Sequence, residues 1–133
     1  MKIIIFACVH NAGRSQMAAA WFNGLADRRR VRALSAGTSP AGQIHPEVLQ
    51  VMLESGMDLS KEIPKLLSND LAAMADLLIT MGCGETCPMF PGLRKDDWAL
   101  EDPKGKPLER VREIRDDIKE RVVALLTREG WQG

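Results

Sequence analysis

Short apolar runs alternate with stretches of helical periodicity along the chain. Residues 2–9 are β-branched and apolar at successive positions, which is typical of a strand buried on both faces of a parallel sheet. From Arg14 onward the apolar residues recur at helical spacing instead, at Met17, Ala20, Trp21 and Leu25. The pattern therefore predicts a buried strand, a short polar connection and a helix at the start of the chain.

The same alternation continues to the other end. Further strands are predicted at residues 31–36 and 76–81, with a short edge strand at 97–100. Further helices are predicted from Pro46 to a stop at Gly56, from the N-cap Ser68 through Met74, and from Pro107 to Gly130. Alternating strands and helices predict an α/β fold, a small doubly wound four-stranded parallel sheet with helices on both faces. We expect residues 1–133 to form a single domain.

The connection between the first strand and helix carries the clearest chemistry. A loop between a parallel strand and a helix directs backbone N–H groups, and the positive end of the helix dipole, at one point. Cys8 lies at that point and is expected to be a thiolate, while Arg14 offers a planar fork for two oxygens of phosphate or arsenate. Ser15 can donate a hydrogen bond to the sulfur, Asn11 can fix the loop backbone, and Gly13 allows torsions that a side chain forbids.

The loop therefore predicts a nucleophilic thiol facing a tetrahedral oxyanion. The residues expected to bind the substrate are Val9, His10, Asn11, Ala12, Gly13, Arg14 and Ser15. A lone cysteine after an apolar strand is often only a small buried residue. Of the three cysteines, however, Cys8 alone has an arginine six positions later.

Composition narrows the partners. Lys and Arg total 18, as do Asp and Glu, so we expect neither nucleic acid nor an anionic membrane as partner. The basic cluster Arg28, Arg29, Arg30 and Arg32 is interpreted as a solvated helix end. No apolar run is long enough to span a membrane, and the N-terminal run is a strand and not a signal peptide. An odd number of cysteines in an unexported chain favours catalytic or redox use, and we expect a cytoplasmic location.

Cysteine, five residues, Arg14 and Ser15, with Asn11 third after the cysteine, resemble the phosphate loop of low-molecular-weight protein tyrosine phosphatases. They also resemble the arsenate reductases built on the same fold, and the continuation to Gln16, Met17 and Ala18 is more similar to the reductases. The resemblance extends over nearly the whole chain and implies a flavodoxin-like strand order 2-1-3-4.

Asp102 and Pro103 follow the last predicted strand, and they resemble the acid loop of this family. The Asp102 carboxyl group could protonate the departing oxygen as a general acid, with Glu101 as the local competitor. The family's phosphatases usually have a pair of tyrosines after this aspartate. Here Lys104 and Gly105 follow, and the chain has no tyrosine, which disfavours an aromatic phosphoester substrate.

Two more cysteines, Cys83 and Cys87, lie in the loop after the third strand. They could be small buried residues, half of a metal site or a redox pair; a metal site is disfavoured because only His10 and His45 could supply imidazole ligands. The resemblance to thioredoxin-coupled arsenate reductases implies a relay in which Cys8 and Cys83 form a disulfide that then passes to Cys83 and Cys87. Relatives that use mycothiol or glutathione, with a glutaredoxin-like or mycoredoxin-type protein, need only Cys8.

The resemblance also bears on metals and on the reaction. Some thioredoxin-coupled members bind potassium, and Asn11 and Ser35 match two of their ligands, but Ala19 and Lys65 replace the two acids, so we predict no metal. No bound cofactor is expected, only an external thiol reductant. The implied function is reduction of arsenate to arsenite in arsenic detoxification. The alternatives are a phosphatase working through a Cys8 phosphoenzyme and a non-catalytic protein that binds oxyanion or arsenite.

Overall fold

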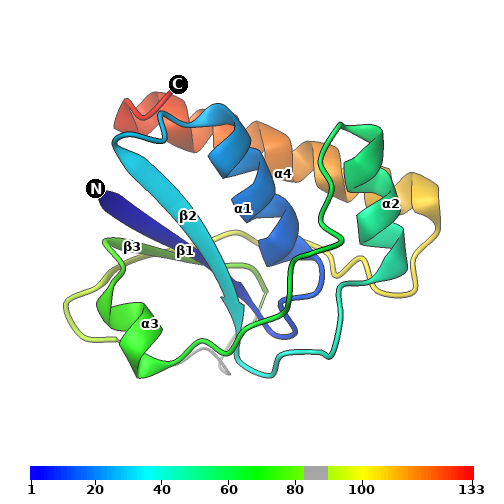
Figure 1. Ribbon diagram of the computed structural model, residues 1–133, viewed down its shortest axis with the longest axis horizontal. Coiled ribbons are helices and arrows are strands. Elements are labelled where there is room, and N and C mark those ends of the chain that lie inside the picture. Colours follow the sequence, from blue (N-terminus) through cyan, green and yellow to red (C-terminus); the bar gives the residue numbers. More distant parts are fainter. Residues whose placement is uncertain (83–89) are drawn as a thin grey trace.

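A four-stranded parallel sheet forms the centre of the molecule, in the computed structural model, which describes residues 1–82 and 90–133. The strands, β1 (Lys2–Cys8), β2 (Val31–Gly37), β3 (Leu77–Thr80) and β4 (Arg94–Asp97), lie in the order β2-β1-β3-β4. Every pairing is parallel, with Cys8 opposite Gly37 at the carboxyl end. The predicted α/β class and the strand order 2-1-3-4 are confirmed (Figure 1).

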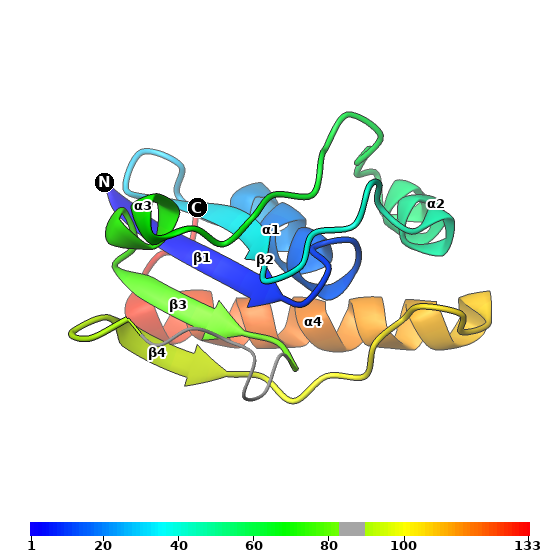
Figure 2. The ribbon, with the colours of Figure 1, turned by 90° about the horizontal axis from the view of Figure 1, so that it is seen from below.

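Helices lie on both faces of this sheet. In Figure 1, α1 (Arg14–Leu25) and α4 (Leu108–Glu129) are on one side and the short α3 (Asn69–Ala73) is on the other. Figure 2 shows α2 (Pro46–Glu54) beyond the carboxyl ends of the strands, next to the start of α4. Of the predicted ends, the Ser68 hydroxyl accepts from the Leu71 N–H, and Gly130 ends α4 in the left-handed region at φ 71°. No helix in the described ranges is both long and apolar enough to cross a membrane.

Strand β1 contributes to both cores because it is buried on both faces. Ile4, Phe6 and Cys8 face α1 and α4, while Ile5 and Ala7 face the smaller layer that includes α3. This is why the run from residue 2 to 9 shows no polar alternation. The burial fixes the end of the strand, and hence the position of the Cys8 sulfur, from both sides.

The predicted edge strand at 97–100 is wrong by three residues. The strand is Arg94–Asp97, four polar residues that pair on one side only with β3. Trp98 is buried because its ring packs 5.5 Å from that of Phe6, after the strand has ended. Its apolar character reflects this packing and not a strand, and an edge exposed to water does not need apolar residues.

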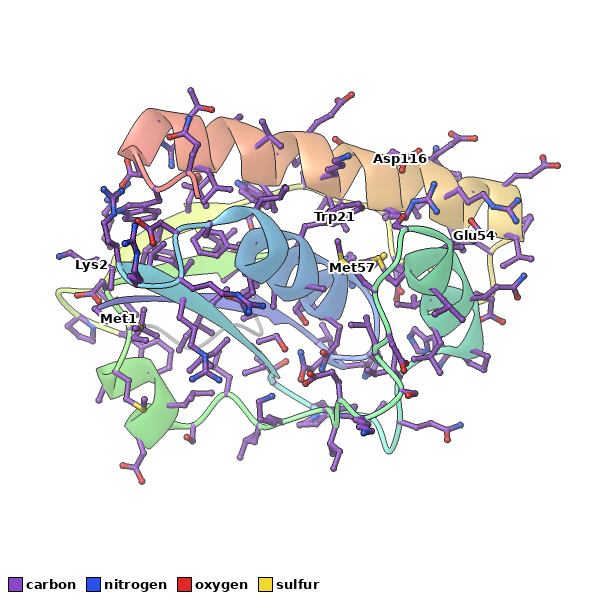
Figure 3. The ribbon with its side chains drawn as sticks, turned by 45° about the horizontal axis from the view of Figure 1, so that its top comes forward. Met1, Lys2, Trp21, Glu54, Met57 and Asp116 are labelled. Atoms are coloured by element: carbon purple, nitrogen blue, oxygen red, sulfur yellow. The ribbon has the colours of Figure 1, made fainter. Side chains whose placement is uncertain are left out.

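Helix α2 is held against α4 by ion pairs. The Glu54 carboxylate accepts hydrogen bonds from Arg112 and Arg115, and Figure 3 shows Glu54 at the contact between these helices. At the other end of α2, the N–H of His45 donates to the carbonyl oxygen of Ala12 at 3.0 Å. Helix α2 is thus held at its carboxyl end by α4 and at its amino end by the loop after β1.

Candidate active site

The loop after β1 turns its carbonyl groups away from its centre. Five successive carbonyl oxygens each accept a hydrogen bond from outside that centre. The acceptor residues are Val9, His10, Asn11, Ala12 and Gly13, and the donors are the N–H groups of Ser39, Ala41, His45 and Met17 and the side-chain amide of Gln16. Peptide carbonyls that point outward leave the N–H groups of the same loop to point inward.

The inward N–H groups form a cradle for an anion. Those of Val9, His10, Asn11, Ala12, Gly13 and Arg14 donate no hydrogen bond to any residue that the structure describes. Helix α1 begins at Arg14 with neither a side-chain cap nor an acidic residue in its first turn. Because free N–H groups at a helix start bind anions, the cradle is complementary to an oxyanion.

The thiol of Cys8 lies at the base of this cradle, 2% exposed, with its Sγ 2.9 Å from the Ser15 Oγ. The Ser15 oxygen also accepts from the Asn11 Nδ2 at 2.7 Å. The Asn11 orientation is fixed because its Oδ1 accepts from the backbone N–H of Lys65 at 2.9 Å. Ser15 is thereby left to donate its own hydrogen to the sulfur, which stabilises a thiolate.

Asn11 adopts a conformation that few residues tolerate, with φ 51°. It is fully buried, and the Gln16 Nε2 donates to both its backbone oxygen and its Oδ1. Gly37 leaves the room that this turn requires, because a Cβ there would lie 2.6 Å from the Val9 oxygen. The curvature of the loop is therefore set by Asn11, Gln16 and a glycine from the neighbouring strand.

Arg14 is held in place by the segment around Leu100 and Asp102. Its Nη1 donates to the carbonyl oxygen of Leu100 at 3.1 Å, and its side chain is 8% exposed. Gly82 makes this placement possible, because a Cβ there would lie 2.3 Å from the Arg14 Nη1. A buried guanidinium fixed from one side presents its remaining N–H groups in a defined direction.

Among the described residues, Asp102 is the carboxylate that lies next to Arg14. Its Oδ2 lies 3.9 Å from the Arg14 Nη2, and its side chain is 46% exposed. The competitor Glu101 is paired instead with Lys106 and Arg110, and the hydrogen bond from Arg110 holds the pKa of Glu101 below its usual value. Glu101 is therefore a poorer proton donor than the sequence alone suggested.

His45 and Pro103 form one wall of the cradle beside Gly13. A Cβ on Gly13 would lie 2.8 Å from the Pro103 Cγ and 3.5 Å from the His45 Cδ2, so the glycine is required for this close approach. Burial lowers the pKa of His45, and the charge of Asp102 opposes that shift. His45 is thus mainly a neutral imidazole at pH 7.

The structure brings together Cys8, the loop residues, Arg14 and Asp102; their roles in catalysis stay predictions. Cys83 and Cys87 lie outside the described residues. Sequence reasoning missed Gly37, Gly82, Gln16 and His45 as parts of the site. The signals for the glycines and the histidine were a glycine directly after each of two predicted strands and a histidine directly before the Pro46 helix start. Gln16 was noted only as part of the resemblance to the reductases.

Together, the parallel sheet and the thiol under a cradle of N–H groups define a class of proteins that bind tetrahedral oxyanions against a cysteine. A family model described as "Low molecular weight phosphotyrosine protein phosphatase" matches residues 3–130. The chain belongs to this family.

Several proteins similar to this chain are named as arsenate reductases. A Halobacterium salinarum protein provisionally named an arsenate reductase is 46% identical over 124 residues, covering 90% of this chain and 87% of its own. A solved Corynebacterium glutamicum thioredoxin-dependent arsenate reductase is 41% identical with a TM-score of 0.81, covering 96% of this chain. This chain spans 61% of the length of that structure. Another solved structure, an arsenate reductase in an oxidized state, is 33% identical with a TM-score of 0.85, covering 96% of this chain and 98% of that one.

Proposed function

We propose that this protein is a thiol-dependent arsenate reductase that converts arsenate to arsenite. The observation that carries the proposal is the cradle of free N–H groups from Val9 to Arg14 above the buried Cys8 sulfur. Such a cradle accepts arsenate and phosphate alike, because both are tetrahedral oxyanions. The choice between them is supported by the names of the relatives and by the two additional thiols in the chain.

In the first step the Cys8 thiolate attacks arsenic and one arsenate oxygen departs. Arg14 and the loop N–H groups hold the remaining oxygens and stabilise their negative charge. Asp102, next to Arg14, protonates the departing oxygen so that it leaves as water. The product is a covalent Cys8–arsenic(V) adduct.

In the second step a second thiolate attacks the Cys8 sulfur. A sulfur–sulfur bond forms, the sulfur–arsenic bond breaks, and its electron pair stays on arsenic, which leaves as arsenite. We assign the second thiolate to Cys83, which follows Gly82 directly in the chain, and Gly82 abuts Arg14. Cys87 then attacks Cys83, which frees Cys8, and thioredoxin reduces the Cys83–Cys87 disulfide by thiol exchange.

An external thiol can replace this internal relay. In that variant mycothiol or glutathione releases arsenite, a mycoredoxin- or glutaredoxin-like protein regenerates the enzyme, and Cys83 and Cys87 are dispensable. Both variants require reduced thiols, so we propose that the protein acts in the cytoplasm, in arsenic detoxification.

The family name favours a second candidate, hydrolysis of phosphomonoesters through a Cys8 phosphoenzyme. Lys104 and Gly105 follow Asp102, and the chain has no tyrosine to pack against an aromatic substrate. A phosphatase would not need Cys83 or Cys87.

One set of assays separates these possibilities. Wild type and the Cys8→Ser, Cys83→Ser and Cys87→Ser variants are assayed for arsenite formation with thioredoxin, mycothiol and glutathione systems separately, and for p-nitrophenyl phosphate hydrolysis without thiol. We expect arsenite formation with the thioredoxin system that all three substitutions abolish. Activity that survives loss of Cys83 and Cys87 with mycothiol or glutathione would select the external route. Efficient hydrolysis without arsenite formation in any system would overturn the proposal.

A further inference from the structure

A cavity lies behind the catalytic loop, between α1, the outer edge of β2 and the segment that leads from α2 to α3. Its volume is about 280 Å³. The residues around it include Gln16 and Asn23 of α1, Ser35 of β2 and Lys65 of the segment between α2 and α3. In Figure 1 the segment between α2 and α3 passes the carboxyl end of β2.

The cavity lies where the outer edge of strand β2 forms no backbone hydrogen bonds to the described chain. Alternate residues of β2 direct their backbone groups away from β1, toward the outer edge. At Ala33 this edge is covered by the Asn23 side chain, which both donates and accepts, and at Gly37 it is covered by Lys65 and Leu67. Ser35 lies between them, and its backbone N–H and C=O bond to no residue in the described part of the chain.

Two buried side chains add unused polar groups at the same place. Ser35 faces α1 together with Ala33, is 3% exposed, and its hydroxyl has no hydrogen-bond partner among the described residues. Gln16 is also 3% exposed; its Nε2 is used by Asn11, and its Oε1 has no partner within residues 1–82 and 90–133. Both atoms keep some accessible surface, since Trp21 Nε1 is the one fully enclosed side-chain polar atom that lacks a partner in the described chain. Polar groups that face a cavity without protein partners normally bind water or a ligand.

Charge around the cavity is mainly positive. Arg28, Arg32 and Lys65 contribute cations, and none of them forms an ion pair with a described residue. Glu62 is the single carboxylate in the lining. The arginines of the basic cluster are all exposed, as the interpretation as a solvated helix end expected. Arg29 and Arg30 pair with Asp27, whereas Arg28 and Arg32 line the cavity.

We propose that this cavity is a second anion site that binds a small protonated oxyanion such as hydrogenphosphate. Lys65, Arg32 and the N–H and hydroxyl of Ser35 are donors for its charged oxygens. Its one O–H group can donate to the Gln16 Oε1 or the Ser35 carbonyl. An anion without an O–H group would leave both of these acceptors unpaired. A metal cation is disfavoured because three positive side chains face one carboxylate.

The second site adjoins the catalytic loop through two residues. Gln16 and the backbone of Lys65 both donate to Asn11, which in turn holds Ser15 against Cys8. An oxyanion that orders Gln16 and Lys65 therefore stabilises the loop from behind, without occupying the cradle itself.

The test is calorimetric titration with sodium phosphate at pH 7.5, with the cradle disabled by Arg14→Ala. We expect this variant to bind one phosphate per chain and the wild type to bind two. Adding Arg32→Gln and Lys65→Gln together should weaken the remaining site by at least roughly ten-fold. Lys61→Gln is the matched control, because Lys61 is exposed on the same segment but does not line the cavity, and it should leave binding unchanged.

Thermal melts with and without phosphate show in parallel whether each variant is folded. If Arg14→Ala does not fold, the wild type carrying Arg32→Gln and Lys65→Gln should bind one phosphate instead of two. A single phosphate in the wild type, or binding that is indifferent to Arg32→Gln with Lys65→Gln, would refute the second site. Saturable binding of potassium chloride in place of phosphate would refute the ligand. None of these outcomes depends on arsenate reduction, so they are separable from the proposed function.

Discussion

The two halves of the candidate active site are built differently. In the loop from Cys8 to Ser15, every outward carbonyl is bonded, Asn11 and Ser15 are fully buried, and the oxyanion donors are mainly backbone groups. In the acid segment around Asp102, the carboxylate is 46% exposed, and the hydrogen bond to it comes from the N–H of Lys104. The half that binds the oxyanion is thus rigid before substrate arrives, while the half that supplies the proton remains in contact with water.

This difference has a physical reason. Electrostatic stabilisation is most effective when donors need no reorganisation as charge develops. A general acid, in contrast, must exchange its proton with solvent between turnovers, which partial exposure allows. Arg14 joins the halves, because it starts α1 and bonds to the Leu100 carbonyl of the acid segment.

The largest effect is expected at this junction, from Arg14→Lys. An ammonium group keeps the charge but loses the fork that binds Leu100 and two substrate oxygens at once. We expect kcat/KM for arsenate to fall by roughly 10²–10³-fold in steady-state assays. Activity within about three-fold of wild type would mean that the N–H groups bind the oxyanion without the guanidinium.

Asp102→Asn tests the exposed half. The amide cannot protonate the departing oxygen, so we expect kcat to fall about 10²-fold and to lose the limb of its pH profile that reports the acid. Glu101→Gln is the matched control, and it should change kcat by less than about three-fold, because exposed ion pairs such as those to Lys106 and Arg110 contribute little. The reverse ranking of the two variants would assign the acid to Glu101.

Gly82→Ala tests the contact between the halves. The added Cβ would lie 2.3 Å from the Arg14 Nη1, and φ is +83°, so we expect kcat/KM to fall by about ten-fold or more and stability by about 1 kcal/mol. Gly92→Ala is the control, because Gly92 has φ +81° but nothing within 4 Å of a Cβ. Urea denaturation should show similar destabilisation of both, and only Gly82→Ala should lose activity. Equal losses of activity would indicate a general effect of backbone strain.

Ser15→Ala removes the hydrogen bond to the sulfur from the rigid half. The N–H cradle remains, so we expect kcat/KM for arsenate to fall about ten-fold in steady-state assays. Ser39→Ala is the control, since only backbone atoms of Ser39 bond to the loop in the described chain. An unchanged kcat/KM in Ser15→Ala would show that the hydrogen bond to the sulfur is not needed and that the helix start and the N–H cradle suffice.

The smallest effect concerns pH and His45, at the wall of the cradle. Burial lowers the pKa of His45 below its usual 6.5, so the unfolded chain binds a proton more readily than the folded chain. The stability linked to His45 is therefore present above pH 6.5 and is lost as the pH falls below it. Denaturation at pH 7.5 and 5.5 should show a smaller loss in His45→Gln than in wild type. An equal loss in both would place the linkage at other groups.

The contrast between the halves also explains what could be predicted from the sequence. The loop from Cys8 to Ser15 is contiguous, so its spacing carries nearly all its geometry, and the strand and helix around it show clear periodicity. Gly82, Gly37 and His45 act through contacts between segments far apart in the chain, which spacing does not encode. The ion pair with Arg110 distinguishes Glu101 from Asp102. This ion pair forms only when α4 packs beside the acid segment.

Edge elements were the least predictable part of the fold. Strand β4 consists of four polar residues, and its position is set by pairing with β3 and not by burial of its own side chains. The strand was predicted at the wrong residues because Trp98, directly after it, is apolar and buried. The cavity at Ser35 lies at the opposite edge, where the covering segments come from distant parts of the chain.

The central claim is that the Cys8 sulfur attacks an oxyanion held in the N–H cradle and that arsenic leaves reduced. It is tested most directly by a single turnover, in which fully reduced protein is mixed with a stoichiometric amount of arsenate without external thiol. With the internal relay through Cys83 and Cys87, the account predicts one arsenite and the loss of two thiols per wild-type chain, and neither from Cys8→Ser. Arsenite formation by Cys8→Ser at the wild-type rate would contradict it.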